Sequence, residues 1–141
     1  MIEKTYYELN QGLSTKELIG KDLQAFIDGT VCCEPACKLD VDTAVTLVDL
    51  AYEVAKKCGF SPIDIELTTM VEHEEGQWKE LYIEVGIEAD HEESAEMLWH
   101  YTNALFTQYP SWPWMGENRE FYMYQITVAI RRCREYKNMT N

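Results

Sequence analysis

The chain lacks any apolar run approaching the roughly 18–20 residues that a membrane-spanning helix needs. It also lacks the charged and apolar regions of a signal peptide at its N-terminus, and it has no low-complexity segment and no repeat of fixed period. These absences predict a single domain over residues 1–141, located in the cytoplasm and without a membrane partner.

Basic residues are scarce as well. The chain has 12 Lys and Arg against 25 Asp and Glu, which gives a formal net charge of −13 at pH 7. Nucleic-acid phosphates must be neutralised by Lys and Arg, so direct binding to nucleic acid is not expected. The acidity favours a basic partner or a cation, or it serves only solubility.

Catalytic signatures are missing too. The sequence contains no phosphate-binding glycine loop, no nucleophile elbow, no zinc-protease motif and no EF-hand loop. Its three histidines, His73, His91 and His100, form no recognisable spacing with a Cys or Ser. We therefore assign no catalytic residue, no cofactor and no metal, and we favour a protein that is not an enzyme.

Two capping boxes mark helix starts, Ser14 with Glu17 and Asp90 with Glu93. Apolar residues then recur at helical spacing. The pattern predicts helices over residues 14–28, 42–58 and 90–109.

Between the second and third helices the apolar period changes from 3.6 to 2. Residues 63–72 and 80–89 alternate on either side of a polar turn, which predicts an antiparallel hairpin with one buried face. A last strand is predicted over residues 119–132, and a crossover through the third helix would place it parallel to the second hairpin strand. Residues 1–13 either form a strand or simply dock on the core, and the tail from Cys133 is expected to fray.

The element order is helix, helix, strand, strand, helix, strand. This order predicts an α+β fold, a two-layer sandwich. Its three- to four-stranded, mainly antiparallel sheet has helices packed on one face.

Carboxylates concentrate on the hairpin and the start of the third helix. This segment contains twelve Asp and Glu residues and a single basic residue, Lys79. Like charges on opposed strands cost a few tenths of a kcal/mol per pair. One interpretation is a solvated face, partly neutralised by Arg119 and Arg131. The other is a docking surface for a basic protein, in one version a loose mimic of nucleic acid. The candidate contact residues are Asp64, Glu66, Glu72, Glu74, Glu75, Glu80, Glu84 and Glu88.

An aromatic loop adds Trp112 and Trp114 as candidate contacts, because Trp is enriched in interface hot spots. The alternatives are that both indoles cap the core or that they join two copies in a homodimer. In the linker, Cys32, Cys33 and Cys37 lack the second ligand pair that is usual in zinc sites. Cys58 is expected to be a small core residue.

The favoured function is a non-catalytic acidic protein-binding module. One example would be an inhibitor, of the kind carried by phages or mobile elements, that occupies the nucleic-acid-binding surface of a partner. The alternatives are a small thiol- or metal-dependent enzyme or redox protein built on the cysteine linker, and a self-associating structural domain.

Overall fold

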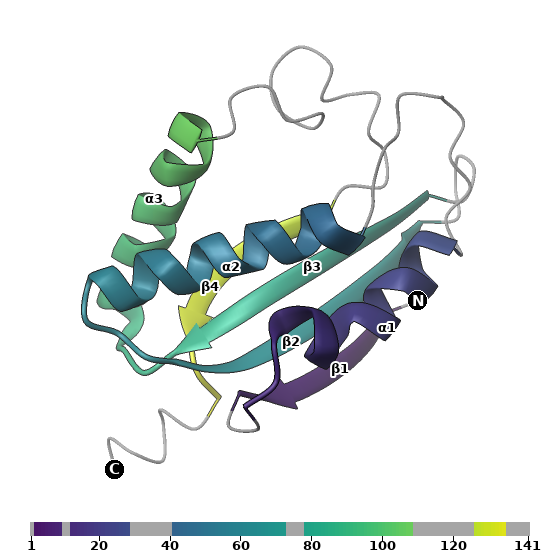
Figure 1. Cartoon of the computed structure of the whole chain (residues 1–141), viewed down its shortest axis with the longest axis horizontal. Helices are drawn as coiled ribbons and strands as arrows, with labels where there is room; N and C mark the ends of the chain where they lie inside the picture. The colour runs from purple at the N-terminus through teal and green to yellow at the C-terminus, as the bar shows by residue number, and fades with distance from the viewer. Residues whose placement is uncertain (1, 10–11, 29–40, 73–77, 109–125, 135–141) are drawn as a thin grey trace.

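The computed structural model describes residues 2–9, 12–28, 41–72, 78–108 and 126–134, and for residues 2, 70–72 and 78–80 it describes the backbone alone. Figure 1 shows a four-stranded sheet with helices on one side. The elements in chain order are β1 Ile2–Glu8, α1 Thr15–Asp28, α2 Val41–Lys57, β2 Pro62–Glu72, β3 Trp78–Ile87, α3 His91–Gln108 and β4 Ile126–Arg132. The predicted two-layer α+β fold is confirmed.

The strands lie in the order β1-β2-β3-β4. The pairs β1–β2 and β2–β3 are antiparallel, and β4 lies parallel to β3, as the crossover through α3 predicts. The N-terminal segment, left open by the sequence pattern, forms the edge strand β1. The described part of the last strand begins at Ile126, and residues 119–125 of the predicted strand lie outside the described residues.

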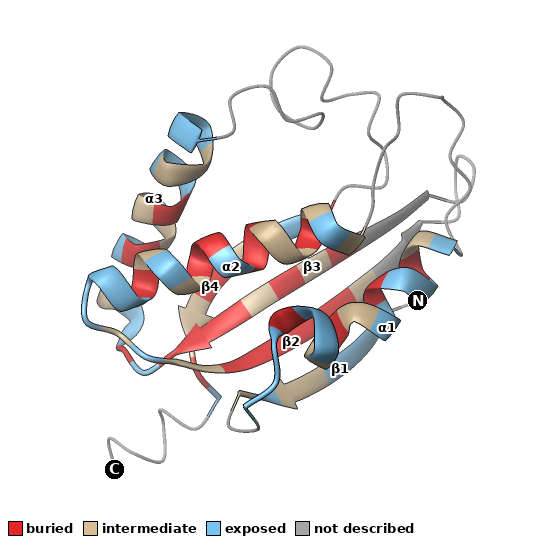
Figure 2. Cartoon of the chain, viewed as in Figure 1, coloured by how far each residue is buried: buried red, intermediate tan, exposed pale blue. Residues whose placement is uncertain are grey.

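The helices bury the apolar positions of the sheet. Ile65, Ile83 and Val85 are each fully buried, and they belong to one core with residues from all three helices. Figure 2 shows buried positions along the strands and along α2, which crosses the sheet. Ala51 and Ala55 are fully buried on α2. Their small side chains let this helix pack closely against the sheet.

Both predicted capping boxes are formed. The Ser14 amide donates to Oε1 of Glu17 over 3.1 Å, and the Glu17 amide donates to Oγ of Ser14 over 3.2 Å. Hydrogen bonds from Ser14, first from its amide and then from its hydroxyl, lower the pKa of the Glu17 carboxyl below its usual value. At α3, the Asp90 and Glu93 amides each donate to the other residue's carboxylate, over 3.0 and 2.8 Å.

Cys58 corrects one prediction. α2 ends at Lys57, and Cys58 is exposed rather than part of the core. The amide of Phe60 donates to the carbonyl of Ala55 over 2.9 Å, and Gly59 has a φ of 87°. These features define a helix end that turns the chain through a left-handed residue. The turn leaves Cys58 in solvent, and Phe60 packs against the core instead.

Replacing Asp90 by Ala tests the cap of α3. We expect the free energy of unfolding to fall by about 1 kcal/mol, because the Glu93 amide loses its acceptor. Urea denaturation measures the change. Asp22→Ala, at an exposed position inside α1, is the matched control and should cause no loss. Equal stability of Asp90→Ala and the unaltered chain would contradict the capping role.

Candidate functional site

Three of the predicted acidic residues, Asp64, Glu66 and Glu84, lie on the face of the sheet opposite the buried core positions. In the register of the strands, Glu66 of β2 lies beside Glu84 of β3, and Asp64 lies beside Gly86. Gly86 in turn lies beside Arg131 of β4. Gly86 therefore lies between Asp64 and Arg131 in the sheet, with one of these residues on the strand to either side.

Arg131 reaches across Gly86 to the carboxylates. Its Nη1 lies 3.1 Å from Oδ1 of Asp64 and also donates to the carbonyl of Arg132 over 2.9 Å. Its Nη2 lies 3.9 Å from Oε2 of Glu66, and its Nε lies 3.8 Å from Oε2 of Glu84. One guanidinium is thus placed among three carboxylates.

Arg134, just after β4, makes further contacts to Asp64 and Glu66. Its amide donates to Oδ2 of Asp64 over 3.0 Å, and the Tyr6 hydroxyl donates to the same oxygen over 3.1 Å. Nε and Nη2 of Arg134 both donate to Oε2 of Glu66, and the guanidinium lies 4.3 Å from the centre of the Tyr6 ring. Nζ of Lys4 lies 3.8 Å from Oε1 of Glu66.

We call these six charged residues, Lys4, Asp64, Glu66, Glu84, Arg131 and Arg134, the open-face network. Asp64 is fully buried and Glu66 is only 7% exposed, so the expectation of a solvated face is wrong at both positions. A buried carboxylate keeps its charge at tolerable cost only beside a counter-charge and hydrogen-bond donors. Arg131 provides the partial neutralisation that one sequence interpretation assigned to it. Arg119 lies outside the described residues.

Gly86 makes the network possible. A Cβ at this position would stand 2.0 Å from Oδ1 of Asp64 and 2.8 Å from Nη1 of Arg131. Both distances are far below van der Waals contact. The position accepts only a residue without a side chain, since the ion pair occupies that space.

The other predicted contact residues are not brought together by the described part of the structure. Glu88 is exposed just beyond β3. Glu72 and Glu80 lie in β2 and β3, where only the backbone is described. The remaining predicted positions lie outside the described residues, namely Glu74, Glu75, Trp112, Trp114 and the linker cysteines Cys32, Cys33 and Cys37.

The sequence analysis missed Arg134, because it treated the tail from Cys133 as frayed. Cys133 is 2% exposed, and its amide donates to the carbonyl of Ile87 over 2.8 Å. This bond extends the sheet and directs Arg134 onto the open face. The available signal was Gly86, a strand-interior glycine that often marks the close approach of another group.

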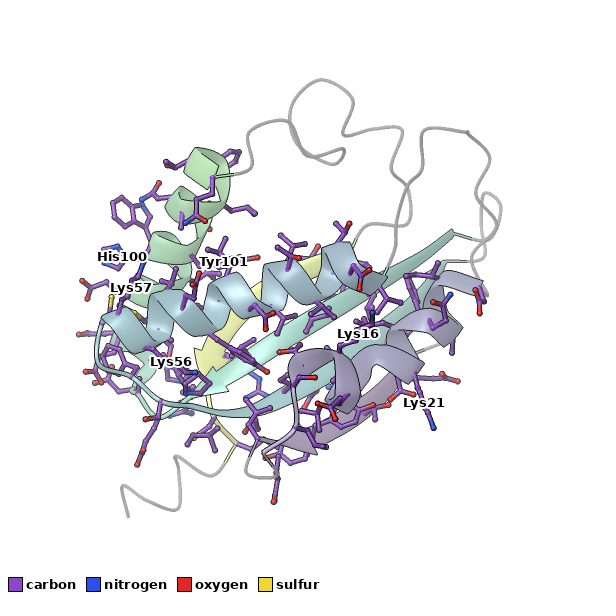
Figure 3. The ribbon with its side chains drawn as sticks, in the orientation of Figure 1. Lys16, Lys21, Lys56, Lys57, His100 and Tyr101 are labelled. Carbon is purple, nitrogen blue, oxygen red and sulfur yellow. The ribbon has the colours of Figure 1, made fainter. Side chains whose placement is uncertain are left out.

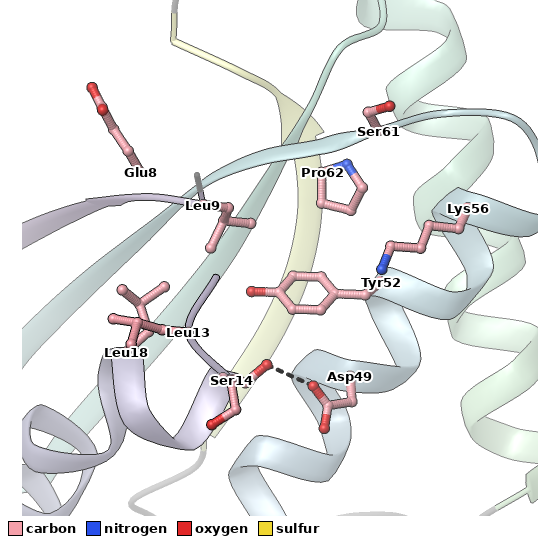
Figure 4. A pocket seen from close by; sticks show the side chains of 11 residues that line it. Glu8, Leu9, Leu13, Ser14, Leu18, Asp49, Tyr52, Lys56, Ser61 and Pro62 are labelled. Carbon is pink, nitrogen blue, oxygen red and sulfur yellow. Dashed lines mark hydrogen bonds between the residues drawn. The ribbon is translucent and has the colours of Figure 1, made fainter. Parts of the chain in front are cut away.

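A pocket of about 560 Å³ lies between the end of β1, the start of α1 and α2 (Figure 4). Oγ1 of Thr15 donates to Oδ1 of Asp49 over 2.6 Å at one side of it. The hydroxyl of Tyr52 is buried there and has no hydrogen-bond partner in the described part of the chain, and burial raises the pKa of this phenol. Figure 4 shows the hydroxyl end of Tyr52 directed toward Leu9 and Leu13.

The described lining of this pocket combines polar and apolar side chains. Its described lining residues include neither His nor Cys, and the carboxylate of Asp49, an exposed residue, accepts the hydrogen bond from Thr15. A phenol with a raised pKa stays protonated and acts as a hydrogen-bond donor. The pocket can therefore offer a small ligand both apolar contacts and a hydrogen-bond donor.

Across the described ranges, no group of three or more His, Cys, Asp or Glu is placed to hold a metal ion. Within those same ranges, no helix is both long and apolar enough to span a membrane. Comparison of the chain with models of protein families, with curated proteins and with solved structures gives no match. The function of this chain must therefore be inferred from its own residues.

Replacing Gly86 by Ala tests the open-face network. We expect the free energy of unfolding to fall by about 3 kcal/mol or more, because the Cβ displaces Asp64 from Arg131 and a broken buried ion pair costs about that much. Thermal or urea unfolding measures it. The control is Gly20→Ala in α1, whose Cβ would stand at an ordinary 3.5 Å from Cγ of Lys16 and should stabilise the helix by up to about 1 kcal/mol. Similar effects of the two variants would exclude the proposed cause.

Replacing Arg134 by Ala tests whether its contact with Glu66 stabilises the fold. We expect a loss of about 2 kcal/mol, since nearly buried Glu66 loses two charge-assisted donors. The neighbouring Arg132→Ala should change stability by less than about 1 kcal/mol, because Arg132 contacts no carboxylate among the described residues. Chemical denaturation of both variants decides the matter, and an Arg134→Ala protein as stable as Arg132→Ala would show that the tail contact contributes nothing.

Proposed function

We propose that this chain is a non-catalytic protein-binding module that engages a basic protein through the outer side of α3. The single observation that carries the proposal is an exposed stripe of acidic and aromatic side chains on that helix. We call it the α3 stripe, and its residues are Glu92, Glu96, Trp99, Asn103 and Phe106.

The spacing of these residues places them on one side of the helix. They follow one another at intervals of four and three, which an α-helix of 3.6 residues per turn brings onto a single face. The opposite face carries the buried residues Ser94, Met97 and Tyr101. Figure 3 shows Tyr101 on the side of α3 toward α2. The stripe therefore faces away from the body of the protein.

The aromatic half of the stripe is unusually accessible. Trp99 is 63% exposed and Phe106 is 57% exposed, two turns further along the helix. Large exposed apolar side chains in contiguous patches mark interaction sites, and Trp is the residue most enriched among binding hot spots. The His100 ring lies edge-on to the Trp99 indole, with ring centres 5.3 Å apart.

The acidic half supplies the preference for a basic partner. Glu92 is exposed, and the Glu96 side chain is 66% exposed. Glu96 lies 3.6 Å from Nε2 of His100, its one ion-pair contact in the described residues. The carboxylates of the open-face network are already matched by arginine and lysine. They support no docking there, and the proposal does not rest on them.

Complementary charge raises association rates and selects partners, whereas a central aromatic anchor provides affinity. A partner that fits the α3 stripe has an apolar groove bordered by Lys or Arg. Such a groove occurs on nucleic-acid-binding proteins, which supports the narrower proposal of an inhibitor of that class of partner.

Affinity capture from a host extract with paired variants tests this proposal. We expect a protein that is retained by the unaltered chain and released by salt. It should be lost with Trp99→Ala and with the double variant Glu92→Lys, Glu96→Lys, which costs the helix less than about 2 kcal/mol. The matched control is Asp22→Lys, Glu53→Lys, which changes the net charge equally at exposed positions on α1 and α2.

Retention by the control and loss by the α3 variants supports the proposal. Retention of the partner by all variants contradicts it. Equal loss of the partner by both double variants would show that binding depends on net charge and not on the α3 stripe. If light scattering shows that the unaltered chain is a dimer and Trp99→Ala a monomer, the stripe binds a second copy instead.

A further inference from the structure

A second cavity, of about 520 Å³, lies where the end of β4 meets the first turns of α3. Figure 1 shows these two ends side by side. Its lining includes Arg131, Arg132 and Arg134, which are three of the four arginines in the whole chain. His91 also lines it, and among the described residues Glu66 is the one carboxylate in its lining. A strongly acidic chain thus gathers its guanidinium groups around one cavity.

Two of these arginines have partners. Arg131 and Arg134 belong to the open-face network, where they lie against Asp64 and Glu66. Arg132, half-buried beside them, contacts no carboxylate among the described residues. Within the cavity its positive charge is the one left uncompensated. A guanidinium has five donors in a planar fork, a geometry that matches a carboxylate.

A buried hydroxyl without a partner points to the same ligand. Ser94 lines the cavity from α3 and is only 4% exposed, yet its Oγ makes no hydrogen bond in the described residues. Leaving a buried hydroxyl unsatisfied costs about 1–3 kcal/mol. An acceptor oxygen from a bound molecule would remove this cost. The N-terminal turn of α3 adds a favourable field for an anion.

The rest of the lining is apolar. Ala95 and Leu98 contribute from α3, and Ile130 contributes from β4. The volume lies within the usual range of about 300–1,000 Å³ for small-molecule sites. A single uncompensated arginine next to Glu66 suits one negative charge better than two. A monoanion with an apolar body therefore fits this cavity better than phosphate does.

We propose that this cavity binds a small organic carboxylate, with its carboxylate between Arg132 and Ser94 and its apolar body against Leu98 and Ile130. The site uses none of the residues of the α3 stripe. It gives the chain a ligand that is separate from its proposed protein partner.

Titration of the full chain with hexanoate tests the proposal. Amide shifts in two-dimensional NMR should move at Ser94 and Arg132, with a dissociation constant of about 1–10 mM, which suits so small a ligand. Hexanamide, which has the same shape without the charge, should bind at least about tenfold more weakly, because one charge-assisted hydrogen bond is worth about 1.5–3 kcal/mol. Inorganic phosphate should neither bind at the site nor displace hexanoate.

Variants test whether Arg132 and Ser94 bind the hexanoate. Arg132→Gln should weaken hexanoate about tenfold or more, and Ser94→Ala should weaken it several-fold, by the loss of one hydrogen bond each. Lys21→Gln, at an exposed position on α1, removes the same charge far from the cavity and should change nothing. The α3 double variant Glu92→Lys, Glu96→Lys should still bind hexanoate, which separates this site from the proposed function.

Four results would overturn the proposal. They are equal binding of hexanamide, unchanged affinity in Arg132→Gln with a native NMR spectrum, displacement of hexanoate by phosphate, and no shifts at Ser94 or Arg132 up to about 20 mM hexanoate, a concentration well above the expected dissociation constant.

Discussion

The buried negative charge of Asp64 is the constraint on which the open face of the sheet depends. Asp64 is fully enclosed on the side of the sheet opposite the core, where a short polar side chain would ordinarily meet water. Its charge requires Arg131 on one side, the Tyr6 hydroxyl and the Arg134 amide on the other, and the missing side chain of Gly86 in between. Residues from all four strands, or from just beyond them, are fixed by this one carboxylate.

Local patterns predicted the local parts of the fold. The capping boxes at Ser14 and Asp90 join residues three apart, and the alternation of the hairpin follows from the two-residue repeat of a strand, so both could be found in the sequence. The parallel placement of β4 followed from the rule for crossovers. Cys58 was misplaced, because a helical pattern does not reveal where the last turn stops.

The open-face network could not be predicted in the same way. Arg134 meets Asp64 across 70 residues of sequence, and no local period records that contact. The sequence indicated Arg131 only as a partial counter-charge, and the alternation of residues 80–89 does not distinguish Gly86 from its neighbours on the same face. Asp64, Glu66 and Glu84 share one face, yet their exposure depended on which cations the fold would bring to them. The α3 stripe could not be predicted either, because the sequence does not show which face of this helix is buried, and its acidic and aromatic residues are interspersed along the chain.

The network also constrains the order in which the chain can reach its final state. Glu66 leaves the ribosome 68 residues before Arg134, the residue that donates to it twice. Domains generally fold as units during synthesis, N-terminal part first. Here the hairpin strand that carries Asp64 and Glu66 is made before Arg131 and Arg134, whereas Lys4 and Tyr6 precede it. The full set of contacts around these two carboxylates therefore forms only after β4 and Arg134 have been made.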